Sequence, residues 1–228
     1  CITAHRQWAI RLCVPLKLIK LPSVYTRSSI RNMKLWKEPI ILASTSPRRK
    51  ELLASIVQNF SVTAPKIDDG VFGRGTMSPR QWVQTLAVLK AQNVQQQRVS
   101  KTGCILGADT VCVLGERIYG QPQSSDEARA MIVSMMGKNH EVLTGWCIIN
   151  ADGSAMQSGV EESIVRVGEF SGKLFESHLE TGAWRGKAGG YNYLECARLG
   201  WPLECRGEID TVIGLPTKKI QQLLVEEI

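Results

Sequence analysis

Hydrophobic and polar positions along the chain form blocks that switch between the period of a strand and the period of a helix. Short apolar runs predict strands, and the clearest of them is the run over 104–114. Amphipathic stretches that follow a Ser-Pro pair or a Ser-Asp-Glu group predict helices. The expected strands are 38–44, 60–64, 104–114, 140–149, 157–169 and 209–213. The expected helices are 46–56, 79–96, 124–136, 171–181 and one that begins at Pro216.

The order of these elements predicts an α/β fold with a mixed β-sheet and flanking helices. Helical crossovers between strands favour parallel pairing, whereas the turn residues at 151–154 between two long strands indicate an antiparallel hairpin. A glycine-rich loop is expected over 182–192. Neither a repeat nor a low-complexity linker interrupts the chain after residue 38, so we expect one domain over 33–228.

The net charge of +7 is concentrated at the start of the 228-residue chain. Residues 1–32 carry six basic side chains and no Asp or Glu; 28 basic residues less these 6 leaves 22 against 21 acidic ones, or +1. A nearly neutral body argues against a nucleic-acid-binding module. We expect 1–32 to be an N-terminal extension outside the fold, from an upstream reading frame or an unusual start, with a targeting peptide as the alternative.

The seven cysteines and three histidines indicate neither disulfides nor zinc. The cysteines include no Cys-x-x-Cys pair and several lie in apolar runs, which predicts reduced, buried thiols and a cytoplasmic location. The histidines are far apart in the sequence. No apolar run reaches the ~18 residues of a transmembrane helix, so no membrane association is expected.

Two arginines stand where a helix normally carries acids. The expected helix after Ser46 has Arg48 and Arg49 in its first turn, although the positive end of the helix dipole favours anions there. They are either solvated surface residues, or they join Ser44, Ser46 and the helix N–H groups around a phosphate.

Acidic residues and one lysine complete a candidate site. Asp109 interrupts an apolar strand, where it either bonds backbone amides or acts as a metal ligand or general base. Asp68 and Asp69 are either a solvated pair or ligands, with Asp109, of Mg²⁺. Lys90 is either a solvated helix residue or a phosphate ligand. Together these groups favour metal-assisted hydrolysis of a phosphoanhydride, since the chain has no Walker A loop and no Gly-x-Ser-x-Gly elbow.

With these residues in these positions, the sequence resembles the Maf family of nucleoside triphosphate pyrophosphatases over 38–228. The carrying motifs are the Ile67-Asp68-Asp69 acid pair, Lys90 on its helix, the Gly120-to-Pro122 turn, ILASTSPRRKELL at 41–53, LGADTVCVL at 106–114, GKAGGYN at 186–192 and DTVIGLP at 210–216. The resemblance implies an elongated fold like that of inosine triphosphate pyrophosphatases, with two lobes around a cleft. It also implies hydrolysis of a nucleoside triphosphate to the monophosphate and pyrophosphate with Mg²⁺ or Mn²⁺, and a homodimer is compatible with it.

The resemblance also implies roles for single residues. Asp109 matches the proton acceptor, Asp68 the acidic metal position and Lys90 the helix lysine of the family. The phosphate-binding loop is matched by Ser44, Ser46, Arg48 and Arg49, and base choice is linked to Arg48 and Thr110.

Two positions depart from the family pattern. Gln121 replaces a lysine, which removes a cation from the cleft, although its amide can still bond a phosphate oxygen. The glutamine that reads the base in the dTTP/UTP branch is missing, which leaves Asn192 as the candidate in that segment. The motifs at 46–49 and 187–191 remain nearer to the dTTP/UTP branch than to the 7-methyl-GTP branch. The Gln121 change keeps one alternative open, a non-catalytic nucleotide-binding regulator of cell division on the same fold.

Overall fold

The structure is a computed structural model that describes residues 39–67, 74–170 and 172–225. The expected extension at 1–32 and the acid pair Asp68 and Asp69 lie outside the described residues.

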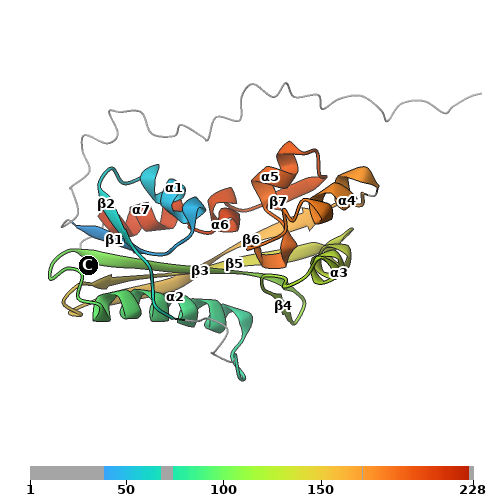
Figure 1. The fold of residues 1–228 in the computed structure, drawn as a ribbon. Coiled ribbons are helices and arrows are strands. Elements are labelled where there is room, and N and C mark those ends of the chain that lie inside the picture. The colour runs from blue at the N-terminus through green and yellow to red at the C-terminus, as the bar shows by residue number, and fades with distance from the viewer. Residues whose placement is uncertain (1–38, 68–73, 171, 226–228) are drawn as a thin grey trace, which may run out of the picture. The chain divides into compact units, whose positions relative to one another are not determined.

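A seven-stranded mixed sheet forms the centre of the described body (Figure 1). Its strands are β1 (Ile40–Ala43), β2 (Phe60–Thr63), β3 (Cys104–Leu114), β4 (Arg117–Tyr119), β5 (Asn139–Asn150), β6 (Met156–Val167) and β7 (Leu203–Arg206). Their order is β2-β1-β3-β5-β6-β7, with β4 paired to β3. β1 runs parallel to β2 and β3, and the other pairs are antiparallel. The expected α/β class and mixed sheet are therefore confirmed.

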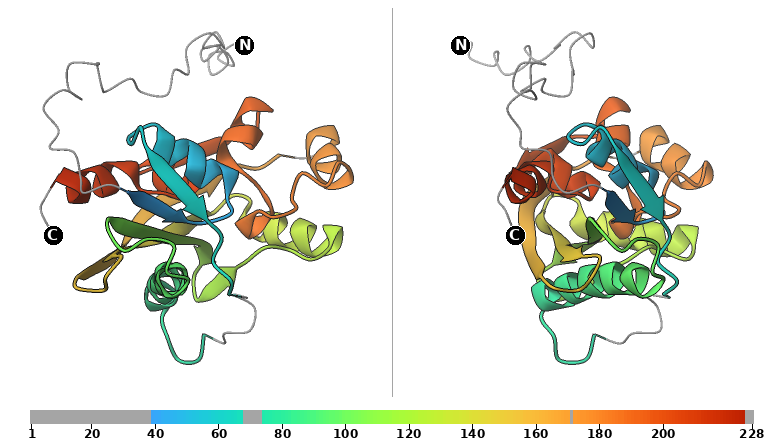
Figure 2. Two further views of the ribbon diagram at one scale, coloured as in Figure 1. Left: turned by 60° about the vertical axis from the view of Figure 1, so that its left-hand side comes forward. Right: turned by 90° about the vertical axis from the view of Figure 1, so that its left-hand side faces the viewer.

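Helices cover both faces of this sheet (Figures 1 and 2). The helices are α1 (Pro47–Ala54), α2 (Pro79–Gln96), α3 (Ser125–Met135), α4 (Lys173–Glu180), α5 (Tyr193–Arg198), α6 (Ile209–Ile213) and α7 (Thr217–Val225), with a 3₁₀ turn η3 (Ala188–Gly190). Among the described helices, only α2 packs on one face. On the other face, α1 and α7 lie towards the end that carries β1, α6 lies near the middle, and α4 and α5 lie towards the opposite end.

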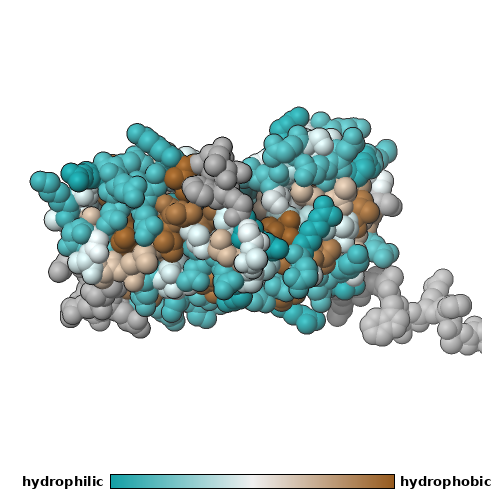
Figure 3. All heavy atoms as spheres, turned by 90° about the horizontal axis from the view of Figure 1, so that it is seen from below, coloured by the Kyte–Doolittle hydropathy of each residue, from teal (hydrophilic) through white to brown (hydrophobic). Residues whose placement is uncertain are grey.

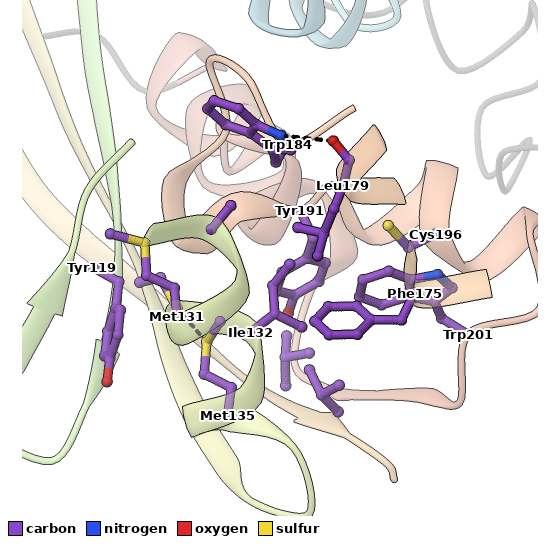
Figure 4. Packing of buried hydrophobic residues seen from close by; sticks show 14 of the residues in the cluster. Tyr119, Met131, Ile132, Met135, Phe175, Leu179, Trp184, Tyr191, Cys196 and Trp201 are labelled. Atoms are coloured by element: carbon purple, nitrogen blue, oxygen red, sulfur yellow. Dashed lines mark hydrogen bonds between the residues drawn. The ribbon is translucent and has the colours of Figure 1, made fainter. Parts of the chain in front are cut away.

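The face opposite α2 carries two separate apolar clusters. One joins β1 and β3 to α1 and α7 through residues such as Leu42, Leu53, Leu106 and Ile220. The other lies between α3, α4 and the segment around Tyr191 and Trp201, as Figure 4 shows. The outward order along β3 on this face is Leu106, Ala108, Thr110 and Cys112, so the polar Thr110 falls between the clusters. This division gives the two expected lobes.

Two glycines allow α2 to lie close against the sheet. A Cβ atom at Gly107 of β3 would stand 2.4 Å from the Ala87 carbonyl oxygen, and one at Gly145 of β5 would stand 2.3 Å from that of Val83. Neither distance is compatible with a side chain, so the bare backbone sets the depth at which α2 sits. The outer surface on this side is hydrophilic around its edges, with hydrophobic atoms gathered towards its middle (Figure 3).

The expected strand at 209–213 is wrong, because these residues form the short helix α6. Its β-branched residues suit a strand locally, but Thr211 is buried against β5, and its backbone oxygen accepts a hydrogen bond from Thr144. Gly214, with φ at 126°, then ends the helix. The last strand of the sheet is instead β7, and the predicted glycine-rich loop includes η3 and leads into α5. Tertiary contacts decide such short elements more than propensity does.

Candidate active site

A cavity opens where one edge of β3 lacks a neighbouring strand. β1 pairs with β3 as far as Gly107, and β4 pairs with it from Cys112, so 108–111 have no partner on that edge among the described strands. The cavity there measures about 400 Å³. Its polar lining comes from Thr45, Ser46, Arg48, Arg49, Lys90, Asp109, Thr110, Gln121, Lys187, Tyr191 and Asn192. Because successive strand residues point to opposite faces, Asp109 and Thr110 project to different sides of the sheet at this gap.

Asp109 and Lys90 form a buried ion pair on the α2 side. Lys90 Nζ lies 2.5 Å from Asp109 Oδ1, and the two side chains are only 11% and 12% exposed. Close packing of α2 at Gly107 and Gly145 brings Lys90 to this depth. A buried carboxylate requires such a partner, which explains how an acid is tolerated inside an apolar strand. The pair therefore holds the carboxylate of Asp109 in a fixed position at the cavity wall, where its oxygens can accept a proton or bind a cation.

The turn between β1 and α1 presents a helix N-terminus to the cavity. Ser46 is the N-cap, and its Oγ accepts a hydrogen bond from Arg49 N at 3.4 Å. The buried Ser44 Oγ accepts one from Ser46 N at 3.1 Å. Arg48 reaches across to the Gly186 carbonyl oxygen at 3.5 Å, so its guanidinium spans the two sides of the cavity. The arrangement suits an anion, as the sequence predicts.

Arg49 is anchored away from the ion pair, on the opposite side of the sheet. Its Nε donates to the Gly214 carbonyl oxygen at 2.9 Å, and its Nη2 donates to Thr110 Oγ1 at 3.2 Å. Thr110 Oγ1 lies 3.0 Å from Thr144 Oγ1, which in turn donates to the Thr211 carbonyl oxygen at 2.7 Å. The network ties α1 and α6 to β3 and β5 between the two apolar clusters.

The segment 186–192 forms the cavity wall opposite the first turn of α1, and two buried histidines contact it. His178 Nε2 lies 2.8 Å from the Gly190 carbonyl oxygen, and His140 Nε2 lies 2.8 Å from the Tyr191 hydroxyl. Burial lowers the pKa of His140 to about 4, so this ring is neutral at pH 7. Asn192 caps α5 by accepting from Glu195 N at 2.9 Å.

The surroundings of two further cavity residues, Lys187 and Cys112, limit what each can do chemically. The ammonium of Lys187 forms an ion pair with Glu195. Burial raises the pKa of the Cys112 thiol to about 12, which excludes a thiolate nucleophile here at neutral pH.

The structure brings most of the predicted site residues to one cavity. Ser46, Arg48, Arg49, Lys90, Asp109, Thr110, Gln121 and Asn192 all line it, and Ser44 supports Ser46 from behind. Asp68 lies outside the described residues. Sequence reasoning gave no role to Lys187 or Tyr191, although both stand in the GKAGGYN motif, and it missed Thr144.

Asp109 meets the main requirement of a divalent cation site. Magnesium in nucleotide enzymes is held by one or two carboxylates, with substrate phosphates and water as the remaining ligands. Among the described residues, no three His, Cys, Asp or Glu side chains gather as a metal site. A cation at Asp109 would therefore depend on phosphate oxygens and on ligands from elsewhere in the chain.

Comparison with known proteins adds to this geometry. The family model described as Maf-like protein matches residues 39–227. The chain belongs to the Maf family. Family members similar to it include a dTTP/UTP pyrophosphatase of Pyrococcus abyssi, 37% identical over 187 residues that cover 81% of this chain and 94% of the relative. Another is a dTTP/UTP pyrophosphatase of Desulforamulus reducens, 36% identical, which covers 82% of this chain and 95% of the relative.

Solved structures give a more distant likeness. A nucleoside-triphosphatase / dITP/XTP pyrophosphatase from Mycobacterium abscessus superposes with a TM-score of 0.37 at 10% identity, over 59% of this chain and 77% of that one. Within the described residues of this Maf-family chain, no helix has both the length and the apolar character needed to cross a bilayer.

Proposed function

We propose that this protein hydrolyses nucleoside triphosphates to the monophosphate and pyrophosphate. The observation that carries the proposal is the buried Lys90–Asp109 pair at the wall of a cavity that also receives a helix N-terminus and Arg48. Such a site can bind a polyphosphate and place a carboxylate beside it. The relatives named dTTP/UTP pyrophosphatases support the same reaction, with dTTP or UTP as the first substrates to test.

Each residue has a defined task in this reaction. Ser46, Arg48 and the first turn of α1 bind phosphate oxygens, and Gln121 at the cavity rim adds an amide donor. Lys90 fixes the orientation of Asp109, whose carboxylate accepts a proton from the attacking water. Arg49 holds the phosphate-binding turn in place through Gly214.

Mg²⁺ or Mn²⁺ is the expected cofactor, with Asp109 and Asp68 as its protein ligands. When bound, the ion would supply positive charge against the phosphates.

The test replaces the proton acceptor and measures pyrophosphate. Asp109→Asn keeps the shape of the side chain but removes the carboxylate, so we expect kcat to fall by at least about 100-fold while nucleotide binding persists. Asp126→Asn, an exposed acid on α3, is the matched control and should retain wild-type turnover. Wild-type turnover in Asp109→Asn would refute the assignment. A wild-type protein that binds triphosphates but releases no pyrophosphate would instead support the non-catalytic regulator.

Further aspects are proposed on the same basis. The catalytic domain is 33–228, in keeping with the family match over 39–227. The five described cysteines are all free, four of them buried, which supports the reduced environment of the cytoplasm. A homodimer stays a prediction, which light scattering can test.

A further inference from the structure

We propose that Thr144 makes Thr110 a pure hydrogen-bond acceptor towards the nucleotide, so that this position selects a nucleoside that offers an N–H or O–H donor. This inference rests on the proposed function, because it assigns the cavity to a nucleotide. Thr144 would be a positioning residue that acts through Thr110.

The direction of the hydroxyl chain follows from counting protons. Thr144 is fully buried, at 0% exposure, and its Oγ1 lies 2.7 Å from the Thr211 carbonyl oxygen. A carbonyl can only accept, and a threonine hydroxyl has one proton, so that proton belongs to this bond. At the 3.0 Å contact between the two hydroxyls, Thr144 must therefore accept and Thr110 must donate.

The only proton of the Thr110 hydroxyl is therefore used in the hydrogen bond to Thr144. One of the two lone pairs of Thr110 Oγ1 accepts from Arg49 Nη2 at 3.2 Å, and this guanidinium is itself fixed by Nε on the Gly214 carbonyl oxygen. Since a hydroxyl offers two acceptor sites, one lone pair remains, on a residue that lines the cavity. Rotation of the Thr110 hydroxyl would break the bond to Thr144, whose fully buried oxygen has no solvent to replace that donor.

The chemistry of this lone pair separates possible ligands. A phosphate or carbonyl oxygen would face it with another lone pair and be repelled, whereas an N–H or O–H group would bind. Uracil and thymine carry an N–H at N3, where cytosine carries an acceptor, and sugar hydroxyls are donors in every nucleotide. Thr110 is also on the sheet face opposite the Lys90–Asp109 pair, so it does not contact the proposed proton acceptor, and its acceptor site repels phosphate oxygens.

The test measures how substrate choice changes when Thr144 loses its hydroxyl. Thr144→Val has nearly the same shape but cannot accept from Thr110, which frees that proton to turn towards the ligand. Thr144→Ser keeps the hydroxyl and is the matched control. Thermal unfolding of both variants establishes that they are folded at the assay temperature.

The substrates are UTP, CTP, N3-methyl-UTP, 3′-deoxy-UTP and 3′-O-methyl-UTP, compared by kcat/KM. For a base donor, the wild type should prefer UTP over CTP and over N3-methyl-UTP by about tenfold, the value of one hydrogen bond. In Thr144→Val the preference over CTP should shrink to about threefold or less, because Thr110 can now donate to N3. Thr144→Ser should keep the wild-type ratio. If the donor is instead the sugar 3′-hydroxyl, 3′-deoxy-UTP shows the loss, and 3′-O-methyl-UTP, whose ether oxygen can only accept, shows both the loss and the recovery in Thr144→Val.

Two outcomes would overturn the inference. One is an equal set of substrate ratios in wild type, Thr144→Val and Thr144→Ser; the other is a wild type indifferent to removal of either donor. Binding of UMP, CMP, N3-methyl-UMP and 3′-deoxy-UMP, measured by calorimetry, reads the same contact without turnover. A protein that shows the expected binding ratios but releases no pyrophosphate would refute the proposed reaction and leave the role of Thr144 supported.

Discussion

Lys90→Met isolates the contribution of the buried ion pair. Methionine approximates the length of the lysine stem but has no charge, so Asp109, at 8% exposure, would keep its carboxylate without the cation that now lies 2.5 Å away. We expect a large loss of stability, together with a loss of turnover, because the carboxylate is no longer held in one orientation.

The geometry gives the size of this loss. Unit charges 2.5 Å apart attract by about 7 kcal/mol at an effective dielectric constant of about 20. Part of that attraction offsets the cost of removing both charges from water, and removal of one partner from a buried pair typically costs about 3–5 kcal/mol. The double variant Lys90→Met/Asp109→Asn has no charge left unpaired and should be more stable than the sum of the single losses predicts, by about 3 kcal/mol.

Urea unfolding of the four proteins in this cycle measures the coupling energy. Arg80, on the same helix as Lys90, and Glu162 of β6 provide a matched control, since they lie 2.8 Å apart with side chains 53% and 40% exposed. Their cycle, with Arg80→Met and Glu162→Gln, should give less than about 1 kcal/mol. A Lys90–Asp109 coupling no larger than that of the control would refute the reasoning.

Two further predictions concern the buried His140 and the close packing of α2 against the sheet. His140 has a pKa of about 4 in the folded protein against about 6.5 when unfolded, so the unfolded state binds a proton first as the pH falls. The wild type should therefore lose about 3 kcal/mol relative to His140→Gln between pH 6.5 and pH 4, and parallel pH profiles in urea titrations would contradict this. Gly145→Ala would place a Cβ 2.3 Å from the Val83 carbonyl oxygen and displace α2, which should cost about 2–3 kcal/mol and reduce turnover because Lys90 moves with the helix. Gly120→Ala, with nothing within 4 Å, should change stability by less than about 1 kcal/mol, and equal losses in the two variants would exclude close packing as the cause.

The long elements of the fold could be predicted from the sequence because several local signals agree there. α2 begins after Ser78 with a proline in its first turn and a capping box to Gln81, and both predicted bounds match. β3 is apolar except at Asp109 and Thr110, as expected for a strand buried on both faces that carries a site at one point. The segment 209–213 has β-branched residues but only one helical turn, so its contacts with β5 decide its structure.

Some residues of the candidate site could likewise be predicted from the sequence, and others could not. Asp109, Arg48 and Arg49 contradict their local surroundings, and a residue that breaks a local rule can be found in one sequence. The partner of Asp109 could not be found, because the approach of α2 depends on two glycines in different strands. Thr144 gives no signal at all: threonine is a common strand residue, and its role exists only through Thr110 and Thr211.

In the proposed site, the gap beside β3 lets a single strand serve two tasks that can evolve separately. In that arrangement, substitutions around Thr110 can change which nucleoside is accepted while the Lys90–Asp109 pair on the α2 side of the sheet stays intact, so substrate choice can diverge without rebuilding the proposed proton acceptor. The same arrangement makes the strand intolerant of a change in length. One residue inserted between Gly107 and Asp109 would turn every later side chain to the other face, exchange the positions of acid and hydroxyl, and remove both functions at once.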